Sequence, residues 1–247
     1  AGGLAVTAIH VNHGLRPSGD DDAIAARRIA DQLGARFRCE HAQLSDGPNL
    51  EARARAARRE LVGADALTGH TADDQAETLL LALLRGSGAT GLAAMTPGPR
   101  HPILALRRSE THALCERLNL QPVTDPTNTE PRFRRNRVRA ELLPLLNTIA
   151  DRDVVPLVVR TADHLRHDDE LLHKLSASLD PTDAKELSDA PAPLAHRAIR
   201  SWLTRDGYPP DAAAVDRVLS VARGDHEACE VAGVGRVSRS QQRLSVT

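Results

Sequence analysis

A histidine followed by two adjacent carboxylates occurs in the segment Thr68-Gly-His-Thr-Ala-Asp-Asp-Gln-Ala-Glu-Thr78. We expect His70 to end a strand, and Asp73 and Asp74 to lie on the first turn of the following helix. Adjacent carboxylates beside a triphosphate can hold Mg²⁺, which takes carboxylate, phosphate and water oxygens, and Asp74 is the candidate ligand. The alternative is a helix whose acidic first turn suits the positive end of the helix dipole. Spacing alone does not separate the two interpretations.

A run of arginines follows further along the chain. Five arginines fall between positions 132 and 139 with no acidic residue among them, and Arg135, Asn136 and Arg139 are the binding candidates within this run. Such a surface can clamp a polyphosphate or the backbone of RNA. A charge run more often forms a solvated face that is paired with acids elsewhere, but such runs usually mix both signs. The missing acids favour anion binding.

Polar residues also follow the first predicted strand, at 5–11. Val11, His13 and Arg16 belong to the segment His10-Val-Asn-His-Gly-Leu-Arg16, where this strand ends. Ligands of open α/β sheets bind at the carboxyl ends of parallel strands, where backbone groups can reach an adenine edge and side chains can reach phosphate. Taken alone, two histidines in such a place are more often ordinary loop residues.

Three further arginines lie on or beside predicted helices. Arg55 and Arg58 belong to an arginine-rich helix expected at 50–62 and could face a nucleotide, although without context this is an ordinary surface helix. Arg85 begins the segment Arg85-Gly-Ser-Gly88 at the far end of the helix that starts with the two carboxylates. The two carboxylates at one end of this helix and the Arg85-Gly-Ser-Gly88 segment at the other together favour a functional role.

Strands that alternate with helices should position these candidates. The alternation in the first half of the chain predicts parallel βαβ units and an open α/β domain over about residues 1–125, and the pattern then becomes helical. We expect strands at 5–11, 36–42, 66–70 and 102–106, helices at 50–62, 73–84, 109–118, 135–149, 154–179, 193–205 and 211–222, and a terminal hairpin from 227–232 and 236–246.

Composition limits the classes of function. Aromatic residues make up 2% of the 247 residues, so RNA binding would depend on charge and shape, because platforms for base stacking are nearly absent. Cys39, Cys115 and Cys229 are far apart, which leaves no disulfide framework or Cys-x-x-Cys site and favours a reducing, cytoplasmic setting. No apolar stretch approaches the roughly 20 residues that span a bilayer, so no membrane partner is expected.

Over most of residues 5–146 the chain resembles the tRNA(Ile)-lysidine synthetase family of PP-loop ATP pyrophosphatases. The matching segments are HxxHGLR, EAxARxxR, GHTADDQAETLLLxLLRGSG and DPTN…FxRNxxR, in the order of that family. The resemblance implies an α/β fold with a doubly wound, mostly parallel sheet at 1–148, followed by a mainly α-helical, tRNA-facing domain at 149–247. The chain departs from the family in one respect: the family's Ser-Gly-Gly-x-Asp-Ser loop, which cradles pyrophosphate, does not appear in this sequence. We expect the 1–148 domain without this loop and the first strand, because Ala1-Gly-Gly3 does not match it.

The resemblance implies a ligase that uses ATP and Mg²⁺. It would adenylate the wobble cytidine of an isoleucine tRNA with a CAU anticodon, and free lysine would then attack carbon 2 to form lysidine. A homodimer is compatible with this. The implied residues are His70, Asp73 and Asp74 for catalysis, Val11, His13, Arg16 and Arg85 for ATP, and Arg55, Arg58, Arg135, Asn136 and Arg139 for phosphate or the target nucleotide.

Two alternatives remain open. Another PP-loop tRNA-modifying enzyme, such as a thiolase, would share the fold. Sulfur transfer in the best-known types, however, calls for paired cysteines, which this sequence lacks. A non-catalytic RNA-binding relative would explain the arginines and the missing loop, but not the retained carboxylates.

Overall fold

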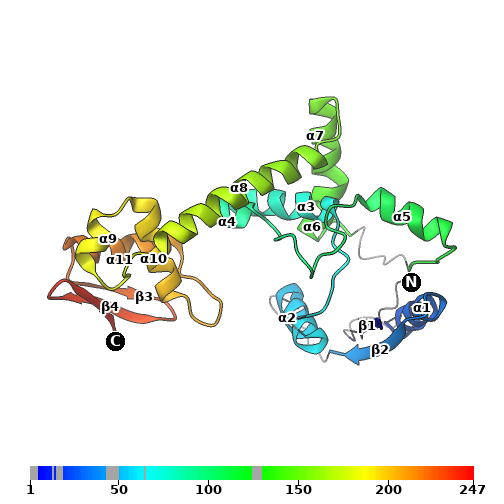
Figure 1. Cartoon of the computed structure of the whole chain (residues 1–247), viewed down its shortest axis with the longest axis horizontal. Helices are drawn as coiled ribbons and strands as arrows, with labels where there is room; N and C mark the ends of the chain where they lie inside the picture. The colour runs from blue at the N-terminus through cyan, green and yellow to red at the C-terminus, as the bar shows by residue number, and fades with distance from the viewer. Residues whose placement is uncertain (1–4, 13, 15–18, 43–49, 64, 124–129) are drawn as a thin grey trace. The chain divides into compact units, whose positions relative to one another are not determined.

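A computed structural model describes residues 5–12, 14, 19–42, 50–63, 65–123 and 130–247 (Figure 1). His13, Arg16 and the segment 125–128 lie outside the described residues, as does the side chain of Arg55. The chain divides into two compact units, Ala1–Ala162 and Asp163–Thr247. The domain boundary expected at 148 stays a prediction, because compact units need not end where functional domains end.

The first unit begins with a parallel βαβ arrangement. Strands β1 (Thr7–Asn12) and β2 (Arg36–His41) pair in parallel from Thr7↔Arg36 to Asn12↔His41, and helix α1 (Gly19–Gln32) connects them. Three aspartates occupy the first turn of α1, where the helix dipole favours negative charge. Helix α2 (Leu50–Val62) follows β2. The strands predicted at 5–11 and 36–42 and the helix predicted at 50–62 are confirmed.

Helix α3 (Ala72–Leu83) carries the two candidate carboxylates and also one side of an apolar core. Its buried face packs against residues from the C-terminal part of the unit. The buried members of this cluster are Ala72, Ala76, Leu79, Leu80, Val138, Leu143, Val154, Val155 and Ala162. Burial of that face fixes which side of α3 is turned toward the later arginines.

Short helices complete the first unit. They are α4 (Ala89–Leu92), α5 (Arg108–Arg117), α6 (Arg134–Arg137) and α7 (Leu143–Ala150), with a π-helical turn, η2 (Val138–Leu142), between α6 and α7. Pro144 lies at the start of α7. Because proline lacks the N–H that would continue the hydrogen-bond ladder, a change of helix type is favoured there.

Two predicted strands, 66–70 and 102–106, are wrong in this structure. Both segments are irregular, and among the described residues the sheet of the first unit contains β1 and β2 alone. Residues 102–106 form successive turns, with Leu104 N–H donating to His101 O at 3.1 Å and Leu106 N–H to Ile103 O at 3.0 Å. Three prolines between 97 and 102 remove backbone donors that a ladder would need.

The second unit packs helices on a small sheet. Helix α8 (Val155–Ser176) crosses the division between units, and α9 (Ala184–Asp189), α10 (Ala192–Leu203) and α11 (Ala212–Arg223) precede the antiparallel strands β3 (Ala228–Val231), β4 (Gly235–Ser240) and β5 (Arg243–Val246). The predicted hairpin is confirmed but has a third strand. Gln241 and Gln242, with φ of 45° and 63°, form the two-residue turn that splits the stretch 236–246.

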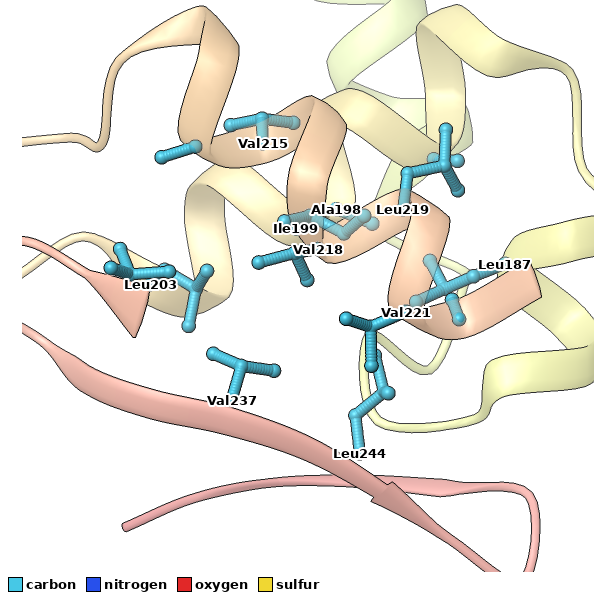
Figure 2. Packing of buried hydrophobic residues seen from close by; sticks show 14 of the residues in the cluster. Leu187, Ala198, Ile199, Leu203, Val215, Val218, Leu219, Val221, Val237 and Leu244 are labelled. Atoms are coloured by element: carbon cyan, nitrogen blue, oxygen red, sulfur yellow. The ribbon is translucent and has the colours of Figure 1, made fainter. Parts of the chain in front are cut away.

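Small aliphatic side chains build the core of the second unit, as the low aromatic content requires. Figure 2 shows Val237 and Leu244 of the sheet directed toward side chains of the helices, among them Ile199, Val218 and Val221. The chain's one tryptophan, Trp202, packs partly buried against this core. Helix α9 was not predicted; the Asp183 carboxylate caps it by accepting hydrogen bonds from two backbone N–H groups. None of the described helices combines the length and apolarity needed to cross a membrane.

Candidate active site

The start of α3 fixes the position of Asp74. The backbone N–H and the hydroxyl of Thr71 both donate to Asp74 Oδ2 at 2.8 Å, which satisfies one of the helix's open N-terminal donors. Burial raises the pKa of Asp74, but the Thr71 hydrogen bonds and the charges of Arg108 and Arg135 outweigh it, so the pKa lies below its usual value. Asp74 is therefore a carboxylate at neutral pH.

Glu77, one turn further along α3, is the most buried charge of the site. Its side chain is 0% exposed. It accepts from Arg135 Nε at 2.6 Å, from Arg139 Nε at 2.7 Å and from Arg108 Nη2 at 3.0 Å. A buried carboxylate is costly unless it is paired and hydrogen-bonded. Burial raises the pKa of Glu77, yet the bonds from Arg139 and Arg135 more than compensate and lower it.

The same arginines also reach Asp74. Arg108 Nη2 lies 3.1 Å and Arg135 Nη2 3.2 Å from Asp74 Oδ1. We call Asp74, Glu77, Arg108, Arg135 and Arg139 the carboxylate–arginine cluster. Three guanidinium groups against two carboxylates leave one net positive charge. The cluster is thus rigidly connected and has cationic charge left for an anion.

Asp73 has different partners. Arg107 binds it with Nε at 3.1 Å and Nη2 at 3.0 Å, a bidentate pair, and Arg108 N–H donates to it at 2.7 Å. Arg107 also pairs with Asp153, whose other oxygen accepts from Val155 N–H at 3.1 Å at the start of α8. Arg107 therefore connects the first turn of α3 to the first turn of α8.

His70 lies beside the cluster. Its pKa is lowered, first by burial and then by Arg135, His101 and Arg58, while Asp74 acts in the opposite direction. These electrostatic contributions place Arg58 of α2 in range of His70, although Arg58 itself is exposed. A neutral imidazole is therefore expected at pH 7.

A hollow of about 410 Å³ opens next to Arg135. Its lining is Thr78, Leu81, Arg85, Arg132, Phe133, Arg134 and Arg135. Arg85 and Arg134 are exposed, and neither forms an ion pair among the residues that the structure describes. Because Arg135 both lines the hollow and touches Asp74, an anion in the hollow would be one side chain away from the cluster.

The described geometry does not fit Asp74 as a Mg²⁺ ligand. One oxygen of Asp74 accepts two bonds from Thr71 and the other faces arginines. Within the described part of the chain, no group of three or more His, Cys, Asp or Glu side chains could hold a metal ion. Both oxygens of Asp74 are therefore already engaged by hydrogen-bond donors, two of them cationic.

The structure thus brings some predicted residues together and leaves others apart. Asp74, Arg135 and Arg139 are in direct contact, and His70, Asp73, Arg58 and Arg85 lie around them. Asn136 Nδ2 instead donates to Glu130 O at 3.0 Å, which ties α6 to the segment that precedes it. Val11 lies on β1 opposite Glu40, and no hydrogen bond among the described residues joins β1 to the cluster.

Three members of the site were not predicted: Glu77, Arg107 and Arg108. A signal existed for Glu77, because an acid three or four residues after two others falls on the same helix face within an otherwise apolar run. The pair Arg107-Arg108 directly precedes a predicted helix, but nothing local indicates that both turn back toward α3.

Comparison with known proteins defines the class. The family model described as a PP-loop domain matches residues 1–146. A U34-tRNA thiolase from Methanococcus maripaludis, solved with its [4Fe-4S] cluster, has a TM-score of 0.54 and 19% identity over 66% of this chain and 62% of that chain. The first part of the chain is therefore a PP-loop domain with a parallel sheet, and the second is mainly helical, as predicted.

The relatives narrow this class to one family. The family model described as the TilS substrate binding domain matches residues 183–245. The tRNA(Ile)-lysidine synthase of Nocardia farcinica is 41% identical over 89% of this chain and 75% of its own length. Those of Mycolicibacterium paratuberculosis and Mycobacterium tuberculosis are 42% and 39% identical over 81% and 88% of this chain, and 68% and 75% of their own lengths. The chain belongs to the tRNA(Ile)-lysidine synthase family.

Proposed function

We propose that this protein is a ligase that attaches lysine to carbon 2 of the wobble cytidine in an isoleucine tRNA with a CAU anticodon, using ATP. The cytosine 2-oxygen attacks the α-phosphate of ATP, and pyrophosphate leaves. The ε-amine of lysine then attacks carbon 2, AMP departs with the oxygen, and the amine loses its proton. The setting is the cytoplasm, where tRNA, ATP and lysine meet, and a homodimer stays an expectation.

The carboxylate–arginine cluster is the observation that best supports this proposal beyond the family relationship. Negative charge grows on the departing pyrophosphate in the first step and on the departing AMP in the second. Preorganised cations stabilise such charge most effectively where water is limited. Arg135 and Arg139 are held in place by the buried Glu77 and have no need to reorganise when an anion arrives.

The remaining roles are proposed from charge and position. Asp73 and Asp74 would act in catalysis by holding Arg107, Arg108 and Arg135 in place, and His70 would contact the nucleotide or base. Phosphate or the target nucleotide would be held by Arg58, Arg135 and Arg139, with Arg55 as a further candidate, and Asn136 would fix the local loop. ATP would be held by Val11, His13, Arg16 and Arg85. Mg²⁺ that accompanies ATP would take its ligands from phosphates and water.

Release of pyrophosphate from ATP tests the proposal. The protein is mixed with ATP and Mg²⁺, and tRNA and lysine are added separately and together. Release that requires tRNA, with lysine incorporated into the tRNA, supports the ligase. Release with tRNA but no incorporation of lysine supports a different PP-loop enzyme, and binding of tRNA without any release supports a non-catalytic relative. A substitution of the target cytidine by uridine is the control and should abolish incorporation.

A further inference from the structure

Thr68 places its hydroxyl between two histidines. Thr68 Oγ1 lies 2.8 Å from His70 Nδ1 and 2.6 Å from His101 Nδ1. The two rings meet edge to face with centroids 5.3 Å apart. The backbone anchors the arrangement, because Thr68 N–H donates to Arg100 O at 2.8 Å, next to His101. The three side chains form one connected unit.

The number of available protons limits how these three side chains can be hydrogen-bonded to one another. A threonine hydroxyl donates one hydrogen bond and accepts up to two, while each neutral imidazole nitrogen either donates or accepts. Thr68 therefore donates to at most one of the two histidines. The other must carry its proton on Nδ1 in order to donate to Thr68. At least one of the two Nε2 atoms is then unprotonated and is an acceptor.

The distances indicate which histidine this is. O–H donors approach their acceptors more closely than N–H donors do, and His101 Nδ1 is the nearer of the two at 2.6 Å. This order of distances favours a hydroxyl proton directed at His101 and an Nδ1 proton of His70 donated to Thr68. Among the described residues, Arg100 O is a further acceptor near the hydroxyl, but at 3.3 Å it is more distant than His101 Nδ1.

We propose that Thr68 and His101 are positioning residues that hold His70 with its proton on Nδ1 and leave Nε2 as an acceptor for an N–H group of a bound substrate. The proposal rests on the proposed function for the identity of that group, since the exocyclic amine of cytosine and the lysine amine both offer N–H. Charged and titratable neighbours of His70 are Asp74, Arg135, Arg58 and His101. The lowered pKa of His70 agrees with a neutral ring.

Nitrogen-15 NMR of the histidine side chains tests the tautomer without any substrate. The wild-type spectrum should show His70, assigned by the loss of its signals in His70→Gln, with the proton on Nδ1. Thr68→Val is nearly isosteric and removes both hydrogen bonds, so His70 should shift toward the Nε2–H form that free imidazole prefers. Thr68→Ser retains the hydroxyl and should leave the spectrum unchanged. An Nε2–H form of His70 in the wild type, or no shift in Thr68→Val, would overturn the proposal.

Kinetics provide the second readout. Thr68→Val and His101→Phe should each lower kcat for lysine incorporation about two- to tenfold, as expected for one misdirected hydrogen bond, with KM for ATP little changed. Thr68→Ser keeps the hydroxyl and His101→Asn keeps a hydrogen-bond acceptor. Both variants should therefore have a kcat close to that of the wild type. Equal activity of Thr68→Val and the wild type would contradict a positioning role. A wild-type protein without lysine incorporation would refute the proposed function while leaving the tautomer measurement valid.

Discussion

Arg139 Nε donates to Glu77 Oε1 at 2.7 Å and joins two segments 62 residues apart in the sequence. Glu77 is fully buried, whereas the Arg139 side chain is 32% exposed. The carboxylate is thus enclosed by protein, whereas the guanidinium that holds it also reaches solvent. The bond raises the pKa of Arg139 further above its already high value, so the pair stays charged throughout the physiological range.

Replacement of Glu77 by Gln should destabilise the protein and abolish activity. The amide cannot balance Arg108, Arg135 and Arg139, and breaking a buried ion pair costs about 3–5 kcal/mol, here reduced to about 2–3 because the arginines are partly exposed. Urea unfolding measures the change. Glu141→Gln is the matched control, because Glu141 pairs with Arg137 in solvent, and it should leave the midpoint unchanged. Equal midpoints for the two variants would contradict the central role of Glu77.

Acid should weaken the first unit through the same carboxylates. The folded-state pKa values of Glu77, Asp73 and Asp74 lie below the ordinary 4.5, 3.8 and 3.8. A depressed pKa contributes stability above the ordinary value and loses it as pH falls through the folded value. The free energy of unfolding should therefore decline as pH falls below about 4.5, and Glu77→Gln should show a shallower decline. Parallel pH profiles of wild type and variant would count against this assignment.

Asp74→Asn should reduce lysine incorporation by about a hundredfold or more, because the amide removes the negative charge that holds Arg108 and Arg135 in place. The amide oxygen can still accept from Thr71, so the helix content should persist and circular dichroism checks this. Asp168→Asn is a control, as Asp168 is exposed on α8. Full activity of Asp74→Asn would remove Asp74 from the catalytic group.

Arg107 and Asp73 should be energetically coupled. A double-mutant cycle with Arg107→Ala and Asp73→Ala should give an interaction free energy of about 1 kcal/mol, since the pair is bidentate and only partly exposed. The cycle for Arg137→Ala and Glu141→Ala, an exposed pair, should give no measurable coupling. If both cycles gave the same interaction free energy, the Arg107–Asp73 pair would contribute no more than an exposed surface ion pair.

Arg85→Gln should raise KM for ATP about three- to tenfold and leave KM for tRNA unchanged, if the hollow beside Arg135 takes phosphate of the nucleotide. Arg117→Gln removes the same charge from an exposed position on α5 and serves as the control. The reverse result, with KM for tRNA raised and KM for ATP unchanged, would assign the hollow to the RNA backbone.

Local sequence patterns predicted many of the helices and strands of this chain. Features that depend on pairing between distant segments could not be predicted in this way. Residues 36–42 and 50–62 became a strand and a helix because periodicity and boundaries agreed there. The segments 66–70 and 102–106 have the apolar composition of strands, yet a ladder depends on a partner that local sequence does not specify. Glu77 was overlooked for a similar reason: its three arginines come from two distant segments, and only their convergence gives it a role.

Trp202 gives the chain an optical reporter that senses one unit only. It is the one tryptophan among 247 residues and packs on the core of the second unit. Indole fluorescence will consequently follow the melting of residues 163–247, whereas ellipticity follows helices of both units. A substitution at Glu77 that moves the ellipticity transition while the emission transition stays in place would show that the two units unfold separately; a joint movement would show that they unfold as one.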